Sequence, residues 1–95
     1  MSATNIVSLN FKNKKAMNDF LVMYKEESPK LFPEAKMLMM VKITETNCLG
    51  ISVYPDVESR DKSRRLAETQ ILGKLSDIFD EDFRLTGEVV VQHIL

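Results

Sequence analysis

The sequence has no tryptophan, one cysteine and one histidine, and its charges nearly cancel to a formal net charge of -1. The lone cysteine, Cys48, cannot form a disulfide within the chain, which fits a reducing compartment. The balanced charge does not supply the electrostatic attraction that drives binding to nucleic acid or to anionic lipid. We therefore expect neither nucleic acid nor a membrane as a partner.

Long apolar runs and linkers are also missing. No stretch approaches the roughly 20 apolar residues of a membrane span, and the first residues lack the basic and apolar segments of a secretion signal. We expect a cytoplasmic protein. The 95 residues show no low-complexity segment, which indicates a single domain over residues 1–95. So short a chain favours a site built between chains, or no site at all.

The centre of the chain reads as two strands, residues 37–43 and 48–54, joined by the polar turn 44–47. In the first strand, Met37, Met39 and Val41 point to one side, and Leu38 and Met40 point to the other. A strand that is apolar on both sides is covered on both sides. Two covering layers are therefore expected around it.

The remaining patterns predict two helices and two further strands. Residues 5–11 alternate as a strand, and a helix follows from the N-cap Asn13 to about Ser28, where Pro29 is expected to stop it. A second helix is expected from residues 56–59 to about residues 79–80, with Leu66, Ala67, Ile71, Leu75, Ile78 and Phe79 on its apolar side. The last strand is expected over residues 83–95.

This order, β-α-β-β-α-β, predicts an α+β protein of the ferredoxin-like type. Right-handed crossovers place both helices on one face of a four-stranded antiparallel sheet. The other face then exposes a large apolar patch, which soluble monomers rarely do. We expect a homodimer formed through this open sheet face.

The chain resembles the dimeric α+β barrel superfamily, which includes the antibiotic-biosynthesis-type monooxygenases. Three segments carry the resemblance, Glu27–Phe32, Gly50–Asp56 and Thr86–Val91, together with the order of elements. The resemblance implies that two sheets pack face to face into a barrel, and that a small hydrophobic or aromatic ligand binds between sheet and helices. The catalytic motifs of these monooxygenases are missing, because the chain has no tryptophan and its one histidine is predicted in the last strand.

His93 is the natural candidate for a general base, because the unperturbed pKa of histidine lies near neutrality. Tyr54, Tyr24 and Asn10 are the candidates for positioning a substrate. The alternative interpretation places His93 at the dimer interface, hydrogen-bonded and without a catalytic role.

Sulfur-bearing side chains offer weaker candidates. Met37, Met39 and Met40 suit soft copper or an adaptable apolar surface, but no cysteine or histidine clearly completes a copper site. Cys48 has no flanking basic residue to lower its pKa, so a structural thiol is expected. We expect no metal and no organic cofactor.

The leading hypothesis is a small homodimer that binds a small hydrophobic or aromatic molecule between sheet and helices. The alternatives are a cofactor-independent monooxygenase or isomerase, and a purely structural or interaction module.

Overall fold

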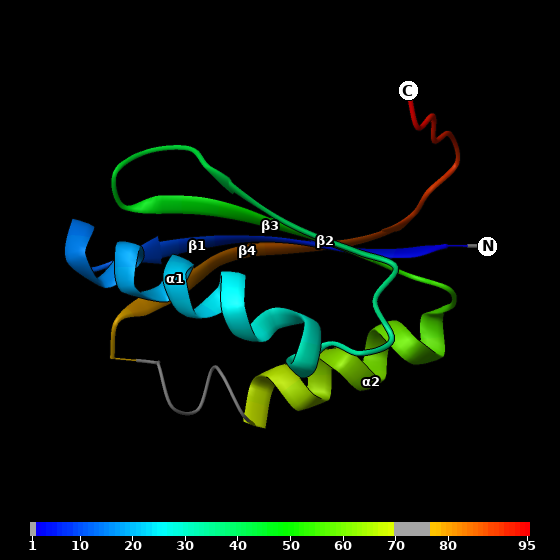
Figure 1. Cartoon of the computed structure of the whole chain (residues 1–95), viewed down its shortest axis with the longest axis horizontal. Helices are drawn as coiled ribbons and strands as arrows, with labels where there is room; N and C mark the ends of the chain where they lie inside the picture. Colours follow the sequence, from blue (N-terminus) through cyan, green and yellow to red (C-terminus); the bar gives the residue numbers. More distant parts are fainter. Residues whose placement is uncertain (1, 70–76) are drawn as a thin grey trace.

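The computed structural model describes residues 2–69 and 77–95, whose arrangement is shown in Figure 1. The elements are β1 (Ala3–Phe11), α1 (Lys14–Leu31), β2 (Met37–Lys42), β3 (Asn47–Tyr54), α2 (Val57–Ala67) and β4 (Phe79–Glu88). They follow in the order that the sequence predicts.

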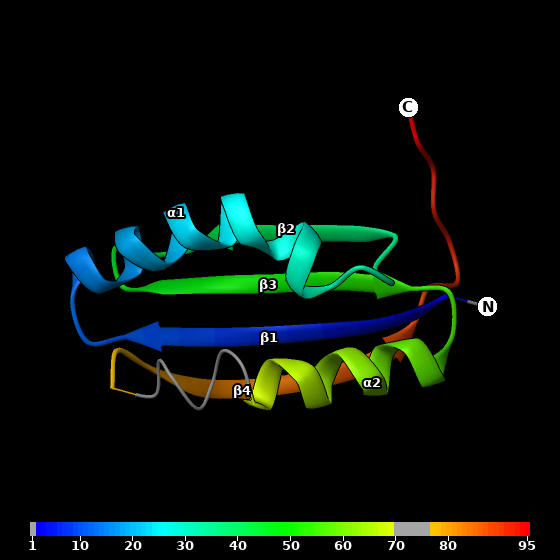
Figure 2. The ribbon, with the colours of Figure 1, turned by 60° about the horizontal axis from the view of Figure 1, so that its bottom comes forward.

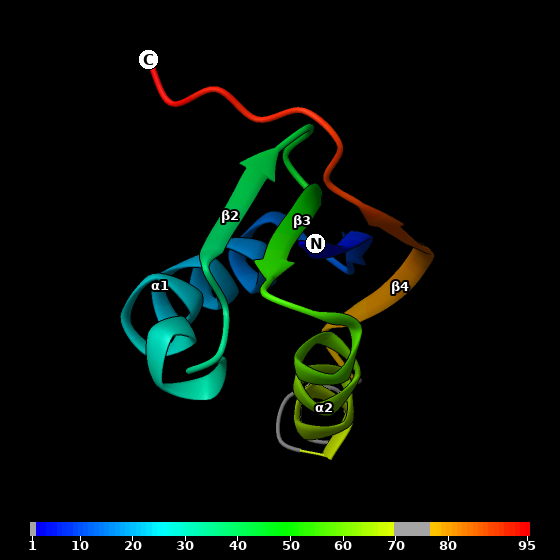
Figure 3. The same ribbon diagram turned by 90° about the vertical axis from the view of Figure 1, so that its right-hand side faces the viewer.

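The four strands form one sheet in the order β2-β3-β1-β4, and every neighbouring pair is antiparallel. Both helices lie on the same face of this sheet, as Figures 2 and 3 show from two directions. The architecture is the predicted ferredoxin-like fold, with one covered and one open sheet face.

The register between β2 and β3 confirms that β2 is apolar on both sides. Met40 pairs with Gly50 and Leu38 with Ser52, on the face toward the helices, whereas Met39 pairs with Ile51 on the open face. Alternation along the strand fixes this division. One set of apolar side chains of β2 therefore faces the helices, and the other set lies on the open face.

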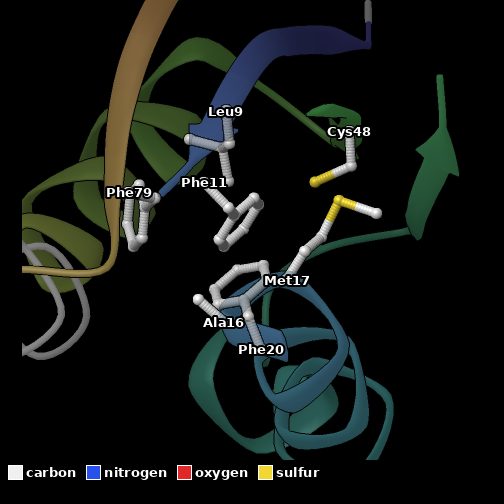
Figure 4. Close-up of a cluster of buried hydrophobic side chains, with 7 residues drawn as sticks. All are labelled: Leu9, Phe11, Ala16, Met17, Phe20, Cys48 and Phe79. Atoms are coloured by element: carbon white, nitrogen blue, oxygen red, sulfur yellow. The ribbon is translucent and has the colours of Figure 1, made fainter. Parts of the chain in front are cut away.

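Helix α1 supplies the helical side chains of the buried core on the covered face. Asn13 caps it, since its side-chain oxygen accepts a hydrogen bond from the Ala16 amide at 2.8 Å. The buried side chains Ala16, Met17 and Phe20 of this helix meet Leu9, Phe11, Cys48 and Phe79 of the sheet, as drawn in Figure 4. The rings of Phe11, Phe20 and Phe79 lie 5.1 to 5.6 Å apart, at tilted angles.

The prediction that Ser28 and Pro29 end the first helix is wrong, because α1 continues through Pro29 to Leu31. The Phe32 amide donates to the Ser28 carbonyl at 2.9 Å and closes one further turn. Leu31 and Phe32 pack against the core. The burial of these two side chains outweighs the steric preference of the residue before proline for an extended backbone.

The predicted start of the second helix is confirmed, since Asp56 caps α2, but its predicted end and both predicted ends of the last strand are wrong. Phe79 begins β4 instead of ending a helix, pairing with Phe11, and Ile78 lies in the preceding turn. Two residues of the predicted helical stripe, Ile71 and Leu75, lie outside the described residues. The strand ends at Glu88, opposite Ala3, the first residue of β1, and one further hydrogen bond joins the Val89 amide to the Ser2 carbonyl at 3.0 Å. Residues 89–95, predicted as strand, leave the sheet on the side away from the helices (Figure 1).

The open face of the sheet carries a continuous set of apolar side chains. Alternation and register place nine of them there: Ile6, Met37, Met39, Val41, Leu49, Ile51, Val53, Phe83 and Leu85. Met39, Phe83 and Leu85 are among the exposed large apolar residues. Neither helix in the part of the chain that the structure describes is long and apolar enough to cross a membrane.

Candidate functional site

A partly enclosed cavity of about 80 Å³ lies between the covered sheet face and the two helices. Its floor is formed by Val7, Leu9 and Gly50 of the central strands, and both helices contribute to its walls. Aromatic rings line much of it: Phe20, Tyr24, Phe32, Tyr54 and Phe79. It holds about half the volume of an engineered cavity of roughly 150 Å³ that takes up benzene. A single ring would fill the enclosed space and extend through its open side.

Asn5 places an unpaired polar atom in this apolar setting. It lies on β1 in phase with Val7, Leu9 and Phe11, so it faces the helices, and it lines the cavity. The residue is only 6% exposed. Its Oδ1 atom is buried and has no hydrogen-bond partner among the described residues. A buried acceptor without a partner is unfavourable by about 1–3 kcal/mol, so this atom is well suited to accept a hydrogen bond from a bound molecule.

The two tyrosines of the chain reach the cavity from opposite layers. Tyr24 projects from α1, its ring stacked on Phe20 at 5.9 Å, and Tyr54 ends β3 as a buried residue. Burial, with smaller contributions from Tyr54 and Cys48, raises the pKa of Tyr24 to about 12. Tyr24 therefore stays protonated at neutral pH and acts as a hydrogen-bond donor, not as a base.

Two arginines border the cavity, and each has an acidic partner. The Arg84 Nε donates to Glu81 Oε1 at 2.9 Å on β4. On α2, the Arg64 Nε lies 3.2 Å from Glu68 Oε1, and both of these side chains are about half exposed. Arg64 thus marks the solvent-facing rim, and carboxylates compensate both positive charges.

Gly50 keeps the floor of the cavity free of a side chain. A Cβ atom at this position would lie 3.1 Å from Val7 Cγ1 and 3.2 Å from Met40 Cε. Both distances are too short for relaxed packing, so any larger residue would push the Met40 side chain aside. The absence of a side chain at residue 50 is therefore part of the geometry of the cavity.

The structure brings together two of the four predicted site residues. Tyr24 and Tyr54 both line the cavity, whereas Asn10 and His93 do not. Asn10 lies at a separate surface hollow of about 200 Å³, among exposed charged residues such as Lys12 and Asp80. The side-chain oxygen of Asn10 accepts a hydrogen bond from Asn47 Nδ2 at 2.7 Å. His93 is exposed in the C-terminal segment, not in a strand as expected.

The larger hollow is the weaker candidate for a site, because the groups around it are exposed and its carboxylates already face solvent. Within residues 2–69 and 77–95, no three acidic, cysteine or histidine side chains gather as metal ligands do.

Burial raises the pKa of the Cys48 thiol to about 11, which makes it a poor nucleophile at neutral pH.

Sequence reasoning missed Asn5, Ser63 and Arg84, which all line the cavity. Asn5 did carry a signal, since it is a polar residue in phase with the apolar residues Val7, Leu9 and Phe11 of its strand. Ser63 is fully buried in α2 and gave no comparable signal, because the surrounding helix is rich in charged residues.

No family model matches the sequence, and no curated protein matches it. Solved structures with the same fold do match. A dimeric ferredoxin-like protein from an uncultured marine organism has a TM-score of 0.76 and 17% identity, over 100% of both chains. A protein of unknown function from Nitrosomonas europaea has a TM-score of 0.78 and 14% identity, over 99% of this chain and 94% of the other.

A third similar structure is a protein from Chloroflexus aurantiacus named after the antibiotic biosynthesis monooxygenases. It has a TM-score of 0.71 and 14% identity, over 98% of this chain and 97% of the other. At these identities the likeness concerns the fold and no residue of the site. The chain therefore has the ferredoxin-like fold that the sequence predicts, in the form shared with these dimeric and monooxygenase-named proteins.

Proposed function

We propose that the protein binds a small hydrophobic or aromatic molecule in the cavity between its sheet and its helices. The observation that carries the proposal is the buried and unpaired Asn5 Oδ1 in a cavity lined by aromatic rings. Ligand sites are typically apolar hollows with a few polar groups that fix orientation. Packing alone would favour an apolar residue in place of Asn5.

As part of the same proposal, the protein acts as a homodimer formed through the open sheet face. The support is the continuous apolar surface of that face, on which Met39, Phe83 and Leu85 are exposed in a single chain. A dimer of this kind leaves the cavity on the outer side of each sheet. We further propose the cytoplasm as its location, on the basis of a single, buried and free cysteine.

The binding proposal is tested with toluene as the probe, by NMR titration of the isotope-labelled full chain. We expect shifts at the Phe20, Tyr24, Gly50 and Ser63 amides that saturate with toluene concentration. Gly50→Ala should weaken binding by roughly fivefold or more, which corresponds to about 1 kcal/mol. The added methyl group pushes Met40 into the space that the ligand would occupy.

Gly87→Ala is the matched control, because a Cβ atom at Gly87 meets nothing within 4 Å. Both variants place alanine on a strand, so a general effect of alanine would appear in both. Equal toluene affinity in wild type and Gly50→Ala, or shifts confined to the open face, would show that the cavity is not the binding site.

A second candidate is an enzyme, a cofactor-independent monooxygenase using molecular oxygen or an isomerase. It is favoured by one observation, that Tyr24 and Tyr54 line the same cavity. In this proposal the two tyrosines position the substrate and His93 is the base, whereas Asn10, at the separate hollow, takes no part. His93 would have to reach the cavity from the C-terminal segment of its own chain or of a second copy. Unchanged turnover in His93→Ala, for any compound found to react, would remove His93 from this mechanism.

A further inference from the structure

We propose that the cavity selects a small neutral molecule, no larger than one ring, that donates a hydroxyl or amide hydrogen to Asn5 Oδ1. The inference rests on the binding function proposed above and adds the chemical class of the ligand. Asn5 lines the cavity, is buried, and offers an acceptor without a partner among the described residues. The Asn5 side chain has both an acceptor oxygen and a donor nitrogen, but Oδ1 is the atom that is buried without a partner, so the complementary group on the ligand is a donor.

The preference for a donor is the same whether or not water donates a hydrogen bond to Asn5 Oδ1 in the free protein. If water reaches Oδ1 before binding, an apolar ligand displaces it and leaves the oxygen unpaired. A hydroxyl of the ligand replaces the hydrogen bond instead. Sites built to hydrogen-bond a hydroxyl reject analogues that lack it, because the buried polar group would stay unpaired. Asn5 therefore discriminates between ligands of equal shape.

The charge of the ligand follows from the surroundings of the cavity. Arg84 is paired with Glu81, and Arg64 with Glu68, so neither arginine is a free cation for an anionic ligand. A carboxylate bound beside Asn5 Oδ1 would place two acceptors against each other in an apolar site. A neutral ligand needs no free cation and avoids the contact between two acceptors.

The test compares phenol with toluene, which have similar shape but differ in the hydroxyl, and adds benzoate as the anionic probe. Affinities are measured by NMR titration of the full chain as wild type, Asn5→Leu and Thr4→Val. Asn5→Leu removes the acceptor and keeps the number and branching of the side-chain heavy atoms. Thr4→Val is the matched control, because Thr4 Oγ1 is the other buried side-chain atom without a partner among the described residues, and it lies on the opposite face of the same strand.

We expect the ratio of phenol affinity to toluene affinity to fall by about tenfold in Asn5→Leu. In Thr4→Val the ratio should stay within about twofold of the wild-type value. Both variants should unfold at a higher temperature, by several degrees, because each removes a buried and unpaired polar atom. The rise shows that the variants are folded.

The failures of the two proposals are distinguishable. If phenol and toluene bind but their affinity ratio is unchanged in Asn5→Leu, the donor requirement is wrong while the binding function stands. Benzoate binding more tightly than phenol overturns the neutral class. If none of the three probes binds at the cavity, the binding function itself fails, and the ligand class falls with it.

Discussion

The two faces of the sheet are both lined with apolar side chains, yet within residues 2–69 and 77–95 the helices cover only one of them. The covered face mixes a packed aromatic core with the polar groups of Asn5, Tyr24, Ser63 and Arg84. The open face is built from aliphatic, methionine and phenylalanine side chains around a few small polar residues. In the function proposed above, the covered face binds the ligand and the open face forms the dimer.

A charge on the open face should produce the largest effect. In Leu85→Glu the new carboxylate would be buried without a partner in both copies of the proposed dimer, so association should weaken by at least a hundredfold. Size-exclusion chromatography with light scattering measures the change in mass. Val57→Glu is the control, since Val57 is exposed to a similar extent, 54% against 56% for Leu85, but lies on α2. Equal association of Leu85→Glu and Val57→Glu would contradict the assigned interface.

A cavity in the core of the covered face should come next. Phe20 is 4% exposed and its ring meets those of Phe11, Tyr24 and Phe79. Phe20→Ala should lower the free energy of unfolding by about 3–5 kcal/mol, measured by urea denaturation at fixed protein concentration. Val22→Ala, at an exposed position two residues further along the helix, should change it by less than about 0.5 kcal/mol. Similar values for the two variants would mean that α1 does not pack as described.

The smallest effect is a loss of stability at high pH. The pKa of Tyr24 is raised from 10.0 to about 12 in the folded protein, and that of Cys48 from 9.0 to about 11. Each group therefore contributes stability that is complete below its unfolded pKa and is lost as the pH rises through the folded value. The free energy of unfolding should decline from pH 9 onward, more steeply between pH 10 and 12.

Tyr24→Phe separates the contribution of the tyrosine from that of the thiol. The variant should keep the decline that begins near pH 9 and lose the steeper part above pH 10. Ultraviolet absorbance of the folded wild type should show one tyrosine ionising near pH 12. Ionisation of Tyr24 near pH 10, its ordinary value, would show that Tyr24 is solvated and does not face a closed cavity.

The division between the faces could be predicted from the sequence where side chains alternate. Residues 37–41 are apolar in both phases, and this pattern led to the sheet, the helices on one side and the apolar open face. The cap at Asn13 was also readable, and its side-chain oxygen accepts a hydrogen bond from the Ala16 amide at 2.8 Å. Local patterns of this kind depend on residues close together in the chain, so one sequence is sufficient to find them.

Boundaries set by distant contacts could not be predicted in the same way. Ile78 and Phe79 continue a helical period after α2, but Phe79 pairs with Phe11 and belongs to β4. Val89, Val91 and His93 alternate as a strand would, but β1 begins at Ala3, and past it the described residues show a single backbone hydrogen bond, from the Val89 amide to the Ser2 carbonyl. For the site, Tyr24 and Tyr54 line the cavity, and their role in positioning a substrate stays a prediction. Asn5 was not named, because the lack of a hydrogen-bond partner for its Oδ1 atom depends on all the side chains that surround it in the fold.

The central claim, that one face is covered by the chain and the other by a second copy, is tested most directly by native mass spectrometry of the wild-type protein. At low micromolar concentration we expect a species of twice the 10.9 kDa chain mass. A spectrum showing only the single chain would contradict it, because the apolar open face would then remain exposed to water without a partner.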